Sequence, residues 1–221
     1  MHLLLIPALI GGLTLLYLRA SEQEKFSNIV VSFFDLRNFR RFMREEGINK
    51  NGYAYLLVTA SWLVLSCFLT YLLLRFVPGF YDNYGLLQGY GIAAGALFSL
   101  FWFKKMVIII TGYFSGYKEP MIESLMLWRF SVINMAIIIL PICLFLNLRI
   151  SDSTHFVITV LHNLFLLAGL ITFSGLYALK IVQEFRQSMQ INVSRYYLFL
   201  YFCTLEILPL VVLSGIFMGR I

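Results

Sequence analysis

A single carboxylate, Glu206, lies near the middle of a long apolar run at residues 196–218. About 20 apolar residues are enough for a helix to cross a bilayer, and an ionisable group inside such a helix needs a partner or a proton. Pro209 follows one turn later and has no backbone N–H, so the carbonyl of Leu205 loses its helical partner beside the acid. Glu206 is therefore either a hydrogen-bonded carboxylate that holds helices together or a proton or cation site.

Polar side chains in two other apolar runs could reach this acid. His162 and Asn163 lie in one run and Asn134 lies in another. At 1.5 Å per residue, His162 should lie about 12 Å and Glu206 about 18 Å below the outer membrane surface. A contact between them, direct or through water, is therefore geometrically open. We hypothesise an intramembrane polar cluster of Glu206, His162, Asn163 and Asn134.

Enzymatic chemistry finds little support in the motifs. The sequence has no HExxH, paired-aspartate, CxxC or phosphate-binding glycine motif, and TFSGL (172–176) lacks the first glycine of an intramembrane serine protease. Cys67, Cys143 and Cys203 lie singly inside apolar runs, without the paired spacing of a zinc or redox site. We interpret them as small buried hydrophobes. The sequence predicts no catalytic residue, no metal and no cofactor.

The composition is that of a membrane protein. Hydrophobic residues make up 60% of the 221 positions and charged residues 13%, against about 25% charged residues in soluble domains. The net charge of +6 comes from basic residues placed between apolar runs, as membrane topology signals are. The bilayer, and no nucleic acid, is the expected partner.

Six apolar runs predict the fold class, an all-α polytopic membrane helical bundle that forms one domain over residues 1–221. The predicted transmembrane helices are 2–18, 53–74, 86–103, 125–148, 155–179 and 196–218. The first is the weakest, because it is short and contains Pro7, Gly11 and Gly12. A cleaved signal peptide is the alternative, but there the positive charge precedes the apolar run, and here it follows. We therefore predict a retained helix.

Basic residues predict the orientation. Of the 17 lysines and arginines, seven lie in residues 19–50, four in 104–129 and three in 180–195, which leaves three for the alternate connections. The positive-inside rule places the rich segments in the cytoplasm and both termini outside. The predicted localisation is the bacterial inner membrane, with both termini periplasmic.

The segment 22–49 predicts a cytoplasmic amphipathic helix. Ile29, Val30, Phe33 and Leu36 share one helical stripe. A second apolar patch of Phe39, Phe42 and Met43 follows. Its edges carry the candidate interface for lipid or partners, Arg37, Arg40, Arg41 and Arg44. Such a helix either lies in the membrane interface, where the arginines reach anionic headgroups, or packs under the bundle.

The third run raises a boundary problem. Lys104 and Lys105 interrupt it, and lysines at mid-bilayer cost about 2.5–3.5 kcal/mol each. They are therefore expected at the cytoplasmic interface, with residues 106–117 continuing as a helix. Gly91 and Gly95 in the same run have the spacing that permits close helix approach.

Two stretches carry a family resemblance. LYFCTLEILPLVVL (200–213) and FSNIVVSFFDLRNFRRFMREEG (26–47) resemble the Bacteroidota integral-membrane family catalogued as domain of unknown function 4271. The resemblance implies a bacterial inner-membrane protein with no assigned activity and emphasises Cys203, Glu206 and Pro209. It supplies no substrate or cofactor.

Three hypotheses of function follow. The first is a structural or assembly subunit of a membrane complex, or a homo-oligomer, that uses the basic segment to dock partners or anionic lipid. The alternative is a small proton- or cation-coupled transporter or channel that uses the cluster at Glu206. The third is a lipid-directed membrane enzyme. The shortage of charged residues inside the apolar runs favours the first hypothesis.

Overall fold

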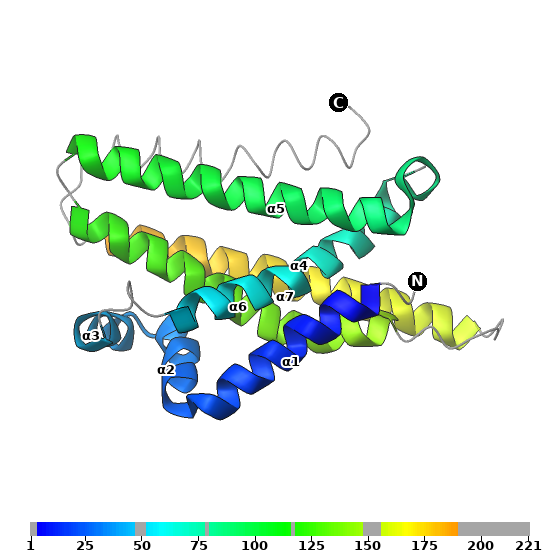
Figure 1. Ribbon diagram of the computed structural model, residues 1–221, viewed down its shortest axis with the longest axis horizontal. Coiled ribbons are helices and arrows are strands. Elements are labelled where there is room, and N and C mark those ends of the chain that lie inside the picture. The colour runs from blue at the N-terminus through cyan, green and yellow to red at the C-terminus, as the bar shows by residue number, and fades with distance from the viewer. Residues whose placement is uncertain (1–3, 47–51, 78–79, 116–117, 148–155, 190–221) are drawn as a thin grey trace.

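The computed structural model describes residues 4–46, 52–77, 80–115, 118–147 and 156–189, and nearly all of them are helical (Figure 1). The helices are α1 (Leu5–Ser21), α2 (Gln23–Phe34), α3 (Leu36–Glu46), α4 (Gly52–Phe76), α5 (Phe80–Ser115), α6 (Lys118–Asn147) and α7 (Phe156–Met189). The predicted helical class is confirmed for these residues. The last predicted run, 196–218, lies outside them.

Four of the described helices are long and apolar enough to cross a membrane. Their candidate spans are Gly52–Phe76, Tyr84–Ile110, Ile122–Leu146 and Val160–Arg186. At 1.5 Å per residue, spans of 25 and 27 residues reach about 37 to 40 Å, more than the roughly 30 Å of a hydrocarbon core. These four helices match the second to fifth predicted runs.

The first predicted run forms α1, a helix of 17 residues that is about 25 Å long. It passes the test for a span only together with α2, from which a bend of 111° separates it. The backbone of Glu22 leaves the helical region at this bend, with φ −138° and ψ 63°. The described residues thus give four candidate spans, or five if the bent pair is counted.

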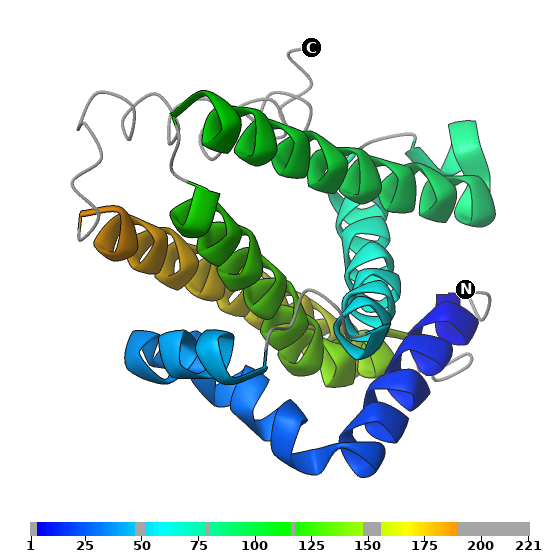
Figure 2. The same cartoon turned by 60° about the vertical axis from the view of Figure 1, so that its left-hand side comes forward.

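Helices α4 and α6 form the centre of the bundle. In their most apolar windows 67% and 61% of the residues are buried, against 22% in α5 and in α7. The outer helices α1, α5 and α7 pack around this pair (Figures 1 and 2). The core between α4 and α6 contains Val64, Phe68, Ile133 and Ile139.

Helix α1 packs closely because it has glycines at the crossing point. A Cβ atom added to Gly11 would lie 2.9 Å from the carbonyl oxygen of Ala60 in α4, and one added to Gly12 would lie 3.1 Å from Leu140 in α6. Since real Cβ atoms do not approach a backbone oxygen so closely, only glycine permits this packing at position 11. Gly11 and Gly12 make the first run a weak sequence signal for a membrane span. In the structure they form the surface through which α1 packs on α4 and α6.

Helices α2 and α3, which we call the elbow (residues 23–46), lie crosswise at one end of the bundle (Figures 1 and 2). The start of α4, the end of α5, the start of α6 and the end of α7 all point to this end. Lys104, Arg129 and Lys180 lie in the halves of their helices that are nearest the elbow. At the opposite end Gly85, the sixth residue of α5, interrupts the helical backbone with a φ of 64°, a conformation that glycine adopts without strain.

Candidate functional site: buried charges at the elbow end

Three charged side chains, Lys104, Lys180 and Glu184, form a buried group that we call the charge cluster. The Oε1 atom of Glu184 is 3.4 Å from the Nζ atom of Lys104, and its Oε2 atom is 3.3 Å from the Nζ atom of Lys180. The three side chains are only 8%, 1% and 2% exposed, in the order Lys104, Lys180, Glu184. Because Lys104 belongs to α5 and the other two to α7, the cluster joins two outer helices by their charges.

The helical period explains this arrangement. Lys180 and Glu184 are four residues apart in α7 and therefore share one face. Lys104 and Lys105 are consecutive, so they point in different directions, and Lys105 lies 4.6 Å over the ring of Trp102 as a cation–π contact. The sequence predicts both lysines at the membrane interface, whereas the structure buries Lys104 and not Lys105.

Gln183, beside the cluster, ties α7 to the elbow. Its Nε2 atom donates a hydrogen bond to the carbonyl oxygen of Phe33. The last four carbonyls of a helix have no partner within it, and Phe33 lies in the last turn of α2. Gln183 therefore satisfies an acceptor that the end of α2 leaves open. The Oε1 atom of the same side chain is buried and has no hydrogen-bond partner in the part of the chain that the structure describes.

Arg129 is a further buried cation at this end, contributed by α6. Only 3% of the surface of Arg129 is exposed. Its guanidinium carbon lies 4.9 Å over the ring of Tyr55 in α4, and its Nη1 atom donates to the sulfur of Met126 at 3.7 Å. An arginine over an aromatic face is stabilised by the ring quadrupole, and more strongly when water is excluded.

The elbow packs beneath the bundle through aromatic side chains. Phe39 and Phe42 of α3 contact Phe130 of α6, with ring centroids 5.6 and 5.9 Å apart. Asp35 interrupts the helical backbone between α2 and α3. Its Oδ1 atom accepts a hydrogen bond from the backbone N–H of Arg37 at 2.9 Å, as a helix cap does. These contacts support a helix packed under the bundle.

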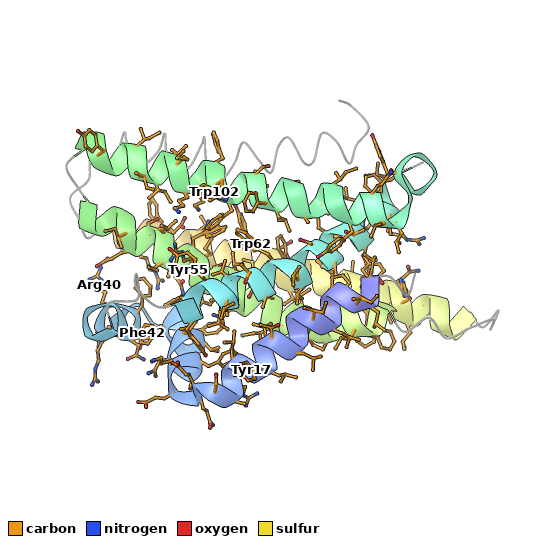
Figure 3. The ribbon with its side chains drawn as sticks, viewed as in Figure 1. Tyr17, Arg40, Phe42, Tyr55, Trp62 and Trp102 are labelled. Carbon is orange, nitrogen blue, oxygen red and sulfur yellow. The ribbon has the colours of Figure 1, made fainter. Side chains whose placement is uncertain are left out.

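The predicted basic edge lies on the other side of α3. Arg37 and Arg41 are exposed and Arg40 is half-buried; Arg40 is labelled with Phe42 in Figure 3. The side chain of Arg44 lies outside the described residues. The elbow thus combines a buried aromatic face with an accessible basic edge.

The predicted polar cluster is only partly described. Asn134 is buried, and its Nδ2 atom donates to the carbonyl of Phe130 in the same helix at 2.9 Å. His162 is half-buried and Asn163 is exposed. Glu206 and Pro209 lie outside the described residues, so the cluster stays a prediction.

Two cysteines are free thiols in the core, as the sequence predicts. The Sγ atom of Cys67 donates to the carbonyl of Leu4 at 3.5 Å, and that of Cys143 to the carbonyl of Val64 at 3.7 Å. Cys203 lies outside the described residues. Over those residues no group of three or more His, Cys, Asp or Glu side chains could hold a metal ion.

Lys180, Gln183 and Glu184 are not among the residues that the sequence predicts for a site, because the fifth apolar run ends at residue 179 and the charges beyond it are typical of a cytoplasmic connection. In the structure α7 continues to Met189. The signal was present in the spacing: a lysine and a glutamate four residues apart, with a glutamine between them, form a polar stripe on a helix that continues.

The described residues thus form a helical protein, in which four helices, or five if the bent pair is counted, are candidates to span a membrane. Residues 5–217 match the family described as "Domain of unknown function (DUF4271)", and the chain belongs to that family. No curated protein and no solved structure matches the chain.

Proposed function

We propose that this chain is a multi-pass protein of the bacterial inner membrane that serves as a structural or assembly subunit of a membrane complex, with the elbow as its docking surface. The observation that supports this proposal is the construction of the elbow. Its buried face is fixed to the bundle, while Arg37 and Arg41 are exposed on its other side.

A fixed docking surface is advantageous because association costs conformational freedom. A loose amphipathic segment would lose backbone and side-chain entropy when a partner ordered it. Here the hydrogen bond from Gln183 to Phe33 holds α2, and the contacts of Phe39 and Phe42 with Phe130 hold α3. The elbow is therefore ordered before any partner arrives.

The charges of the elbow favour a protein partner over lipid. Residues 23–46 contain five basic side chains, Lys25, Arg37, Arg40, Arg41 and Arg44, and four acidic ones, Glu24, Asp35, Glu45 and Glu46. Segments that bind anionic lipid are clusters of Lys and Arg with a strong positive excess. A surface of both signs instead suits a partner with a complementary pattern.

The proposed orientation places the elbow in the cytoplasm, with six transmembrane helices and both termini outside. It is supported by the distribution of basic residues, of which 14 of 17 lie in the segments 19–50, 104–129 and 180–195. The positive-inside rule assigns such segments to the cytoplasmic side.

Charge reversal on the elbow tests the proposal. The double variant Arg37→Glu with Arg41→Glu should lower the amount of co-purifying protein at least about tenfold after mild detergent extraction, as expected when like charges oppose at an interface. Arg75→Glu is the matched control, since Arg75 is an exposed arginine at the end of α4 that lies away from the elbow.

The readouts are the size of the complex on a native gel and quantitative mass spectrometry of the co-purified chains. A wild-type protein that migrates as a lone 25.6 kDa chain in its detergent micelle would contradict the proposal. So would a double variant that keeps its partners. If the double variant lost only binding to phosphatidylglycerol vesicles, the elbow would be a lipid-binding surface and not a docking surface.

A further inference from the structure

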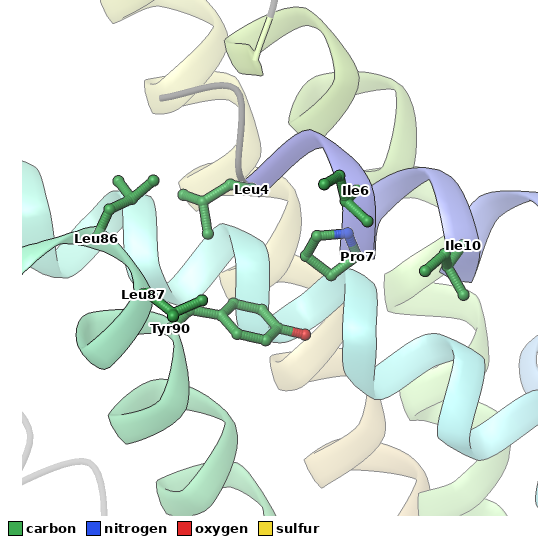
Figure 4. A pocket seen from close by; sticks show the side chains of 7 residues that line it. All are labelled: Leu4, Ile6, Pro7, Ile10, Leu86, Leu87 and Tyr90. Carbon is green, nitrogen blue, oxygen red and sulfur yellow. The ribbon is translucent and has the colours of Figure 1, made fainter.

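An apolar groove of about 240 Å³ opens between α1 and α5, near the end of the bundle opposite the elbow (Figure 4). The residues that line it include Leu4 just before α1, Pro7 and Ile10 of α1, and Leu86, Leu87 and Tyr90 of α5. All of them except Tyr90 are aliphatic. The groove does not belong to the charge cluster or to the elbow.

The size and the walls of the groove limit what can occupy it. Sites that enclose a whole small-molecule ligand measure about 300–1,000 Å³, so this groove takes part of a molecule. Water would need two to four polar partners to stay there, and aliphatic walls do not offer them. Ile10 and Leu87 are 52% and 70% exposed, so the groove opens sideways, where acyl chains surround a transmembrane helix.

One polar atom distinguishes this groove from an ordinary lipid-facing surface. The hydroxyl of Tyr90 is buried and has no hydrogen-bond partner within the described ranges. In the view of Figure 4 its ring extends from α5 toward Pro7 of α1. The carbonyl of Leu4, on the same wall, already accepts the thiol of Cys67. A buried hydroxyl without a partner is costly, so a bound molecule that brought an acceptor would be held here.

We propose that this groove binds one acyl chain of a glycerolipid, and that an ester carbonyl oxygen of the lipid accepts a hydrogen bond from the Tyr90 hydroxyl. Tyr90 lies six residues inside the candidate span Tyr84–Ile110, about 9 Å along the helix. Helical side chains tilt toward the N-terminus, which brings the hydroxyl back toward the boundary of the hydrocarbon core. Ester groups lie at this boundary.

A quinone fits the groove less well than a lipid ester. Its second carbonyl would need a second donor, and its flat ring would need a flat wall, whereas Tyr90 is the only polar or aromatic side chain among the described residues that line the groove. The site also stands apart from the proposed docking function, because the elbow lies at the other end of the bundle (Figure 1).

Lipid binding to the purified full chain tests the proposal. Native mass spectrometry with added dioleoyl-phosphatidylglycerol should show one retained lipid on the wild-type protein. Tyr90→Phe, which removes only the hydroxyl, should weaken this binding about 3- to 10-fold, the effect of one lost hydrogen bond. Tyr84→Phe is the matched control, since Tyr84 is an exposed tyrosine in the same helix, and it should bind as the wild type does.

An ether-linked analogue of the lipid separates the specific hydrogen bond from general binding of lipid. It lacks the ester carbonyl, so it should bind the wild-type protein as weakly as the ester lipid binds Tyr90→Phe, and the variant should not distinguish the two lipids. Leu87→Trp, which fills the groove, should abolish retention. Equal retention by all the proteins, retention of detergent alone, or equal affinity of the wild type for ester and ether lipid would overturn the proposal.

Discussion

Glu184 illustrates how a residue with a high burial cost can be accommodated in an apolar bundle. Removing a charge from water costs several kcal/mol even after relaxation, and the carboxylate recovers part of this through Lys104 from another helix and Lys180 from its own. The neighbouring polar residues follow the same rule, since Gln183 bonds to Phe33 and Arg129 lies over Tyr55. Each of these buried polar groups contacts a second helix, so the cost of burial is offset only when the helices assemble correctly.

Neutralising this carboxylate should therefore destabilise the bundle. In Glu184→Gln the two buried lysines lose their shared partner, and we expect the free energy of unfolding to fall by about 3–5 kcal/mol, as for other broken buried pairs. Adding Lys180→Met should restore part of the loss, because one buried cation is removed with it. Reversible unfolding in detergent micelles measures both effects.

Glu24→Gln is the control for this series, since Glu24 is an exposed carboxylate in α2. It should change the stability by no more than about 0.5 kcal/mol. An equally small change in Glu184→Gln, or a further loss on adding Lys180→Met, would show that the cluster does not contribute as described.

At the scale of elements, α1 and the elbow show how short helices are held by a few contacts of high specificity. Helix α1 depends on Gly11 to approach α4, and Tyr53 at the start of α4 donates to the carbonyl of Leu18 at 3.0 Å. The bend of 111° that follows turns α2 across the end of the bundle. The position of the elbow is therefore set at both of its ends, by α1 before it and by the contacts of Phe39 and Phe42 after it.

A methyl group at the crossing of α1 and α4 should loosen this arrangement. In Gly11→Ala the new Cβ atom would lie 2.9 Å from a backbone oxygen that cannot rotate away, and we expect a loss of about 1–3 kcal/mol, as for other overpacked sites. Gly91→Ala is the matched control in α5, where a Cβ atom would meet nothing within 4 Å. It should gain up to about 1 kcal/mol from the better helix propensity of alanine. Thermal unfolding in micelles compares the two, and equal shifts in both variants would contradict the close packing of α1.

For the whole molecule, the sequence predicts the helices that depend on long apolar runs. It does not predict the angles between helices or which side chains meet across them. The four long helices were predictable because their hydrophobic length exceeds the bilayer core. The bend after α1 was not, because helical periodicity gives no angle between successive helices. The burial of Lys104 and Glu184 escapes the sequence for a related reason: a charge predicts the end of an apolar run, whereas a partner on another helix allows the run to continue past it. Of the candidate site, the basic edge of α3 was predicted and the charge cluster was not.

The orientation of the whole chain is the remaining prediction, and single cysteines can test it. In a background with Cys203→Ser, the native Cys67 and Cys143 should stay unlabelled because both are fully buried. Arg41→Cys, at an exposed position on the elbow, should react with a membrane-impermeant maleimide only after the cells are opened. Tyr84 is 47% exposed and lies near the opposite end of the bundle, so Tyr84→Cys should react in intact cells.

The reason for this expectation is the positive-inside rule, which places the basic connections in the cytoplasm. Labelling of Arg41→Cys in intact cells would invert the proposed topology, and the elbow would then face periplasmic partners.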